Sequence, residues 1–288
     1  MYRSAAFISL ILLTAGCASL KRLPGKMMAD TMSGVVEAMY ANPDPETVRQ
    51  GMPTMLLLMD GMIAKDPTNR DLLQQGALAY GAYCQSFLMD KQDSKRAARM
   101  FHQARGYGIR LLRTYPAIDA AFDERQDAFD AALLTIPPER AGDLYAAGAS
   151  WLGWILANSG SMDAIADLPR AKAVMDRLAT VDPDYGDGVV HLFYGIFYAA
   201  QPRGAGQDLP RSTAAFKRAI ELAGPDALAP RVAYAEFVGK ASLDEELFTS
   251  ELNAVVAADL NAAPQLRLAN TLAQDRANYL LENMDEWF

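Results

Sequence analysis

The chain has 288 residues, of which 51% are hydrophobic and 22% are charged, so it is long enough for a self-sufficient core. Its formal net charge of -8 at pH 7 argues against nucleic-acid binding, because contact with phosphates needs a basic surface. Alanine, leucine and methionine are prominent and runs of β-branched residues are few, a composition that favours an all-α protein.

The first residues have the features of a lipoprotein signal peptide. Residues 5–13 form an apolar run that is too short to span a bilayer, which takes about 20 residues. The run ends in LLTAGCAS, where Gly16 and Cys17 resemble a bacterial lipoprotein box, although Thr14 stands where leucine is commonest. An ordinary signal peptide with an incidental cysteine is the alternative. Ala18 replaces the aspartate that would retain a lipoprotein in the inner membrane, so we expect anchoring in the outer membrane, facing the periplasm.

The lipoprotein box divides the chain into three parts. Residues 1–16 are expected to be the lipoprotein signal peptide and residues 17–26 a lipidated, basic tether. Residues 27–288 are expected to be a single helical domain, because no low-complexity linker divides them. With Cys17 acylated, Cys84 has no partner in the chain, so no internal disulfide is expected. Cys84 lies in a helical stretch and is expected to behave as a small buried hydrophobe.

The rest of the chain is predicted to be helical, without a sheet. No stretch alternates polar and apolar residues with a period of two, as a half-buried strand would. Proline-containing breaks, such as Tyr115-Pro116 and Gly224-Pro225, separate the helical stretches. The predicted helices cover residues 27–40, 45–65, 69–89, 93–114, 117–133, 138–158, 167–180, 187–200, 211–223, 227–239, 243–258 and 264–283.

Residues 191–223 are predicted to form two antiparallel helices. The first is apolar and aromatic on nearly every face, as in a helix that is deeply buried or lines a cavity. The loop PRGAGQDLP ends it. The second helix shows the 4, 3, 5 spacing of small, aromatic, alanine and breaking residues found in a tetratricopeptide repeat, at Ser212, Phe216, Ala219 and Gly224. Pairs at 143–180 and 69–114 repeat part of this pattern, so the expected fold is all-α, with stacked antiparallel helix pairs and degenerate tetratricopeptide-like repeats.

Signatures of enzyme and metal chemistry are scarce. The two histidines, His102 and His191, lack a partner at metal-ligand spacing, and there is no nucleophile elbow or phosphate-binding loop. DPDYGDG at 182–188 faintly resembles a calcium loop, but Phe193 stands where a bidentate glutamate is required. We therefore expect no catalysis, no cofactor and no metal.

Two sets of side chains are candidates for binding. Four carboxylates at spacings of 4, 4 and 3 are expected on one helix face, which either is solvated or meets a basic partner; they are Asp119, Asp123, Asp127 and Asp130. Aromatic residues gather on the first helices of the predicted pairs, at Trp151, Trp154, Phe193, Tyr194, Phe197 and Tyr198. These either pack between repeats or line a concave surface or pore that binds an apolar ligand. Arg203 follows a proline at the mouth of a loop and is expected either to grip a carboxylate bidentately or to form a structural salt bridge.

Taken in order, several segments resemble the T component of tripartite ATP-independent periplasmic (TRAP) transporters. They are GMPTMLLLMDGMIAKDPTNRDLLQQGALAYGAYCQSF, ASWLGWI, AAQPR, LAPRVAYAEFVGKASLDEELFTSELNAVV and RLANTLAQDRANYLL. The resemblance covers nearly the whole mature chain, and the succession is more specific than any one motif. The departures are Thr14 and the loop RGAGQDLPRS, which Leu209-Pro210 lengthens.

The resemblance implies a lipid-anchored protein of cryptic tetratricopeptide repeats that associates with the transporter's periplasmic solute-binding protein. It also implies a ring-like homo-oligomer, such as a trimer, with a central pore. The expected function is that of a non-enzymatic accessory protein that passes a small organic or apolar ligand through this pore. The alternative is a repeat lipoprotein that acts as a scaffold for envelope protein assembly, since repeat solenoids often bind protein segments in their grooves.

Overall fold

The computed structural model describes residues 38–88, 94–204 and 206–288. Within these residues the chain is helical and contains no strand, so the predicted all-α fold is confirmed. The signal peptide, the tether with Cys17 and most of the predicted helix at 27–40 lie outside the described residues.

The helices agree with most of the predicted ranges and are joined by short connections. Their bounds are α3 (Pro45–Lys65), α4 (Arg70–Phe87), α5 (Ser94–Arg113), α6 (Pro116–Ala121), α7 (Gln126–Leu133), η3 (Pro138–Arg140), α8 (Ala141–Ala157), α9 (Met162–Val181), α10 (Tyr185–Ala200), α11 (Leu209–Ala223), α12 (Ala229–Tyr234), a π-helical turn η4 (Ala235–Gly239), α13 (Lys240–Ser242), α14 (Glu245–Val256), η5 (Pro264–Leu266), α15 (Arg267–Glu282) and η6 (Met284–Glu286).

Local sequence signals explain where several helices begin. At the start of α3, the Asp44 carboxylate accepts hydrogen bonds from the backbone N–H groups of Glu46 and Thr47. Asp208 caps α11 in the same way, through the N–H of Arg211. Such caps satisfy N–H groups that have no partner inside the helix. These caps fix the helix starts through residues adjacent in sequence. The predicted start of α3 at residue 45 is confirmed, whereas α11 begins at Leu209, two residues before its predicted start.

The predicted helix at 117–133 is wrong, because the structure divides it into α6 and α7. The Arg170 guanidinium, from α9, donates to the carbonyl oxygens of Phe122 and Glu124 in the intervening turn. The Phe122 ring is buried there. Side chains distant in sequence therefore hold a turn that local periodicity does not indicate.

The expected single face of four carboxylates is also wrong, for the same reason. Arg113 pairs with Asp119 at 3.0 Å and with Asp123 at 2.8 Å, on the α6 side of the turn. Asp127 and Asp130 lie beyond the turn, on α7. The four carboxylates therefore do not form one continuous surface on a helix.

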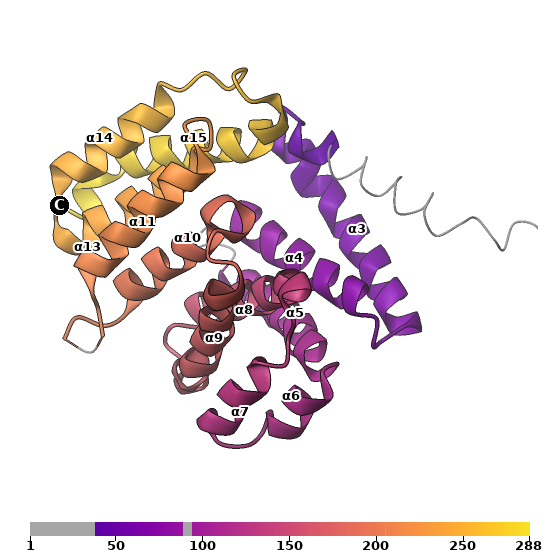
Figure 1. The fold of residues 1–288 in the computed structure, drawn as a ribbon. Helices are drawn as coiled ribbons and strands as arrows, with labels where there is room; N and C mark the ends of the chain where they lie inside the picture. Colours follow the sequence, from indigo (N-terminus) through magenta and orange to yellow (C-terminus); the bar gives the residue numbers. More distant parts are fainter. Residues whose placement is uncertain (1–37, 89–93, 205) are drawn as a thin grey trace, which may run out of the picture.

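Consecutive helices pack as antiparallel pairs that follow one another around an arc (Figure 1). Helix α4 contacts α5 and α8, and α8 contacts α9, whereas α6 and α7 are inserted between α5 and α8. Helix α10 packs mainly against α11, and its contacts with α8 and α9 are sparser. The last long helix, α15, contacts α3, so the arc returns to its beginning.

The pair α10 and α11 is closely packed because small residues let the backbones approach. Ser212 is fully buried, and its hydroxyl donates to the carbonyl oxygen of Gly195 at 2.7 Å. A methyl group added at Gly195 would lie 2.8 Å from the ring of Phe216, which is itself fully buried. Ser212 and Phe216, the small and aromatic positions of the repeat-like spacing, therefore hold α10 and α11 together.

The junction between α9 and α10 has an unusual backbone. Gly186, Asp187 and Gly188 all have positive φ values, of 59°, 53° and 96°. A non-glycine residue in this region costs about 1–2 kcal/mol, so Asp187 is held there by its surroundings. A methyl group added at Gly188 would lie 3.1 Å from the backbone of Ala219 in α11. The regular right-handed part of α10 therefore begins after Gly188, close to its predicted start at residue 187.

Cys84 is buried in α4, with none of its surface exposed, as predicted. Burial raises the pKa of its thiol to about 12. At pH 8 the thiolate fraction is then about 10⁻⁴, compared with about 0.2 for an ordinary cysteine, and the thiolate is the nucleophile. We expect iodoacetamide to label Cys84 at least about a thousandfold more slowly in the folded protein than in urea. Mass spectrometry of the peptide that contains Cys84 measures both rates, and equal rates would contradict the buried placement.

Candidate functional site

Trp151 is a core residue of α8. It is 1% exposed, and its indole N–H donates to the Asp167 carboxylate of α9 at 2.8 Å. Its ring stacks on Phe122, with a centroid distance of 6.1 Å and an angle of 11° between the planes. Arg105, from α5, pairs with the same carboxylate and lies 5.4 Å from the Trp151 ring. Trp151 therefore joins three elements of the core and is not available to a ligand in the described structure.

Trp154 lies one turn later on α8 and differs from Trp151 in its surroundings. Its side chain is partly buried and packs against two clusters of buried residues, one around α4 and α5 and one around α8, α9 and α10. The guanidinium of Arg105 lies 4.3 Å from its ring centroid, a distance typical of a cation–π contact. Part of the Trp154 ring therefore remains accessible from outside the core.

The aromatic residues of α10 divide into two pairs. Phe193 and Phe197 are 5% and 9% exposed, and their rings stack at 6.0 Å within the cluster formed with α8 and α9. Tyr194 and Tyr198 are only partly buried, and their rings stack on each other, also at 6.0 Å. The phenylalanines are packing residues, whereas the tyrosines lie at the margin of the core.

Polar neighbours fix the orientation of the two tyrosines. The Tyr194 hydroxyl donates to the Asp176 carboxylate at 2.6 Å, and burial together with this carboxylate raises the pKa of Tyr194. Lys172 lies 6.0 Å from the Tyr194 ring centroid, and the Arg211 guanidinium lies 5.7 Å from that of Tyr198. The accessible aromatic surface of α10 is therefore flanked by two ion pairs, Lys172 with Asp176 and Arg211 with Asp208.

A family model described as the TRAP transporter T-component matches residues 41–288. The chain belongs to the TRAP transporter T-component family. The family resemblance inferred from the sequence is therefore confirmed, and the protein is an envelope-associated component of a TRAP transport system. The chain is also similar to an uncharacterized protein of Treponema pallidum (strain Nichols), at 23% identity over 308 residues that cover 96% of this chain and 94% of the relative.

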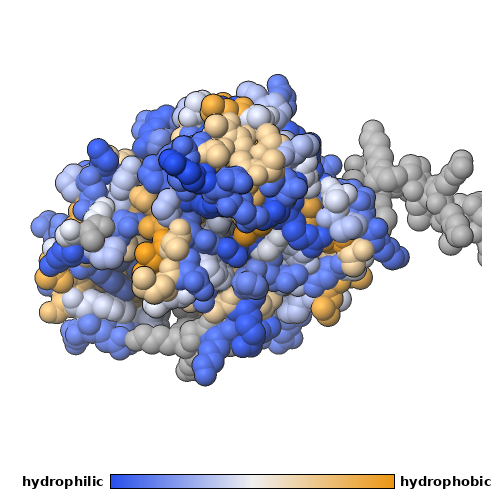
Figure 2. Space-filling view, turned by 90° about the horizontal axis from the view of Figure 1, so that it is seen from below, coloured by the Kyte–Doolittle hydropathy of each residue, from blue (hydrophilic) through white to orange (hydrophobic). Residues whose placement is uncertain are grey.

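The described part of this T-component has no helix that is both long and apolar enough to cross a bilayer. On the face shown in Figure 2, the apolar areas are small and lie among hydrophilic residues. The large exposed apolar side chains of the described residues are spread over several elements: Tyr40, Leu57, Leu58, Leu134, Met162, Ile165, Leu243, Val256, Tyr279 and Phe288. This surface therefore has mixed polar and apolar character, which is usual for non-obligate protein–protein interfaces.

Among the described residues Arg203 forms no salt bridge, which was one of the two contacts expected for it, whereas a bidentate contact with a ligand carboxylate stays a prediction. It is exposed in the loop after α10, and its Nη2 donates to the carbonyl oxygen of Ala241 in α13 at 2.9 Å. In the described residues this places its guanidinium on a backbone carbonyl rather than on a carboxylate. Arg203 therefore holds the loop after α10 against α13.

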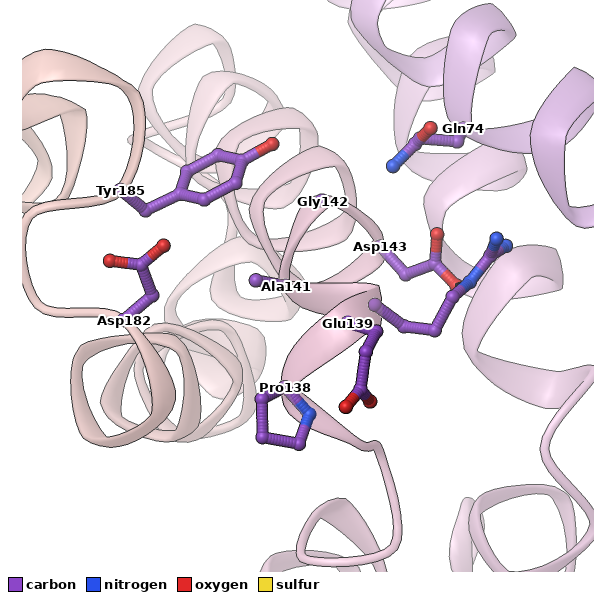
Figure 3. A pocket seen from close by; sticks show the side chains of 9 residues that line it. Gln74, Pro138, Glu139, Ala141, Gly142, Asp143, Asp182 and Tyr185 are labelled. Atoms are coloured by element: carbon purple, nitrogen blue, oxygen red, sulfur yellow. Dashed lines mark hydrogen bonds and ion pairs between the residues drawn. The ribbon is translucent and has the colours of Figure 1, made fainter.

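A polar cluster that the sequence motifs did not indicate lies at the start of α8. Asp143 is fully buried, and its Oδ2 accepts hydrogen bonds from the Tyr115 hydroxyl at 2.6 Å and from Arg140 Nε at 3.0 Å. Figure 3 shows Asp143 in one view with Gln74 and Tyr185. The available sequence signal was an aspartate in the first turn of an otherwise apolar helix, but its partners come from other elements and could not be identified.

Proposed function

We propose that this T-component is a non-enzymatic, lipid-anchored accessory protein that associates with the periplasmic solute-binding protein of a TRAP transporter. Family membership over residues 41–288 supports the link to transport, and the lipoprotein box at Cys17 supports the anchor. In this proposal residues 1–16 are removed as a signal peptide, and residues 17–26 tether a single helical domain, 27–288, to the outer membrane. The domain faces the periplasm, where the solute-binding protein is found.

The observation that carries the ligand-handling part of the proposal is the stacked pair Tyr194 and Tyr198. Both rings are partly exposed and lie within 6.0 Å of a cationic side chain. An accessible aromatic face suits a small organic solute with apolar surface, and a carboxylate on that solute would compete with Asp176 and Asp208 for the two cations. We propose that these tyrosines and Trp154 line a pore in a ring-like homo-oligomer such as a trimer, while Trp151, Phe193 and Phe197 support them from the core.

Affinity capture tests the proposed partner. The tagged protein is purified from cross-linked membranes, and the proteins that accompany it are identified by mass spectrometry. We expect enrichment of a periplasmic solute-binding protein relative to a capture in which Tyr194 and Tyr198 are both replaced by alanine. Recovery of outer-membrane assembly factors, without a solute-binding protein, would instead support a scaffold role and contradict the proposal.

Alanine at Phe197 and at Tyr198 separates packing from binding on the same helix. Phe197→Ala is expected to lower the free energy of unfolding by about 3–5 kcal/mol, because a buried aromatic ring leaves a cavity. Tyr198→Ala is expected to cost less than half as much, because its ring is already partly exposed, and to weaken binding of the solute-binding protein. Urea unfolding and surface plasmon resonance measure the two effects. If both variants are equally unstable and bind normally, α10 does not line a pore.

A further inference from the structure

The polar cluster at the start of α8 borders a pocket of about 380 Å³ that is separate from the aromatic surface of α10. Its polar lining comes from α4, from the beginning of α8 and from the junction of α9 and α10, and consists of Gln74, Glu139, Arg140, Asp143, Asp182 and Tyr185 (Figure 3). Three elements distant in sequence thus place their polar groups around one space.

Asp143 provides the observation that points to a ligand. Its side chain is 1% exposed, and whereas Oδ2 accepts two hydrogen bonds, Oδ1 is buried without a partner among the described residues. In Figure 3 one carboxylate oxygen of Asp143 points toward the side of the pocket where Gln74 lies, and Oδ2 is the oxygen that pairs with Arg140. A buried acceptor without a donor is costly, and native proteins rarely leave one unsatisfied. Arg140 Nη2 is likewise buried without a partner among the described residues. The pocket therefore calls for a molecule that both donates a hydrogen bond to Asp143 and accepts one from Arg140.

Two further polar groups, the Gln74 amide and the Tyr185 hydroxyl, lie close to Gly142, which forms part of the pocket wall. A methyl group added at Gly142 would lie 2.3 Å from Gln74 Nε2 and 3.1 Å from the Tyr185 hydroxyl. Burial and the nearby carboxylates of Asp182 and Asp143 raise the pKa of Tyr185, so its hydroxyl stays protonated at neutral pH. Within the described residues neither Gln74 nor the Tyr185 hydroxyl makes a hydrogen bond, so both can donate to a ligand.

The charge of the lining favours a cation. Glu139, Asp143 and Asp182 contribute three carboxylates, and Arg140 contributes one guanidinium, which already pairs with Asp143 and with Asp71 at 3.1 Å. The lining therefore carries net negative charge, which suits an ammonium group that donates to carboxylates.

We propose that this pocket binds a small molecule with an ammonium group and an adjacent hydroxyl or carboxylate, with the ammonium on Asp143 Oδ1 and the adjacent group accepting from Arg140, Gln74 and Tyr185. The site does not depend on the proposed role of the aromatic residues, since it shares no residue with them. Because Tyr185 and Asp182 belong to the junction of α9 and α10, where contacts between helices are sparse, an occupied pocket also joins the two parts of the arc.

Isothermal titration calorimetry with three small probes tests the chemistry. Ethanolamine has the ammonium and the acceptor, glycine is the zwitterion, and glycolate has the acceptor without the ammonium. We expect saturable binding of ethanolamine and glycine with a Kd of about 1 mM or below, given the size of such ligands, and at least about tenfold weaker binding of glycolate. Absence of heat from both amines, or equal binding of glycolate, would overturn the proposal.

Two variants and one control assign the binding to this pocket. Asp143→Asn removes the charge and is expected to weaken ethanolamine binding at least about tenfold. Since Asp143 also holds Tyr115 and Arg140, Gly142→Ala provides an independent test, because the added methyl group occupies the space in front of Gln74. Gly81→Ala is the matched control, since a methyl group there meets nothing within 4 Å. Normal binding by a folded Gly142→Ala protein, verified by circular dichroism, would place the cation elsewhere.

Discussion

Replacing Trp151 by alanine is expected to lower the free energy of unfolding by about 3–5 kcal/mol, the range for large aromatic residues in protein cores. The ring is almost fully buried, stacks on Phe122 and donates to Asp167. Its removal leaves a cavity and also takes away a partner of the Asp167 carboxylate and of Arg105. Urea unfolding followed by circular dichroism measures the loss.

Trp154→Ala is the matched control, because it removes the same side chain one turn later on the same helix. Trp154 is only partly buried, so we expect its loss to cost about 1–2 kcal/mol. If the proposed function is correct, folded Trp154→Ala protein binds the solute-binding protein more weakly than folded Trp151→Ala protein does. Equal destabilisation by the two changes would mean that both tryptophans belong to the core.

Replacing Cys17 by serine is expected to abolish lipid attachment entirely, because the oxygen of serine does not accept the thioether-linked lipid of a lipoprotein. Metabolic labelling with a fatty acid should lose its signal, and the protein should remain unprocessed or leave the membrane fraction. Each buried methylene of an acyl chain contributes about 0.8 kcal/mol to membrane binding, so the loss of the chains should be evident in fractionation.

Cys84→Ser provides the control for this experiment within the same chain. Cys84 is the other cysteine in the sequence and is buried in α4, so its replacement should leave both the acyl label and the membrane fraction unchanged. A label that persists in Cys17→Ser and disappears in Cys84→Ser would reverse the assignment of the anchor.

The extent of the helices was largely predictable because their limits depend on neighbouring residues. Asp44 and Asp208 cap α3 and α11 through N–H groups two or three positions away. The division of the predicted helix at 117–133 was not predictable in this way, since the turn is held by Arg170, more than 40 residues later. A contact between residues more than 40 positions apart produces no periodic pattern in the sequence.

The candidate site shows the same limit. The spacing of the aromatics on α10 indicates that Phe193, Tyr194, Phe197 and Tyr198 cannot all face one neighbour, and the structure indeed separates phenylalanines from tyrosines. The different exposure of the two tryptophans on α8 was not predictable, because it depends on the packing of α5 and α9 around them. The Asp143 pocket was missed because its lining comes from three separate elements.

The contact between α15 and α3 has a consequence for how this protein can evolve. Linear repeat proteins change length readily, since a helix pair can be added to or lost from either end and contacts only its immediate neighbours. Here the last long helix also meets the first one of the described chain. An extra pair at the C-terminus would have to displace this contact, and a missing pair would leave it unmade. We therefore expect relatives to differ in loops and insertions such as α6–α7 more than in the number of helix pairs, because a change at the C-terminal end disturbs the contact of α15 with α3.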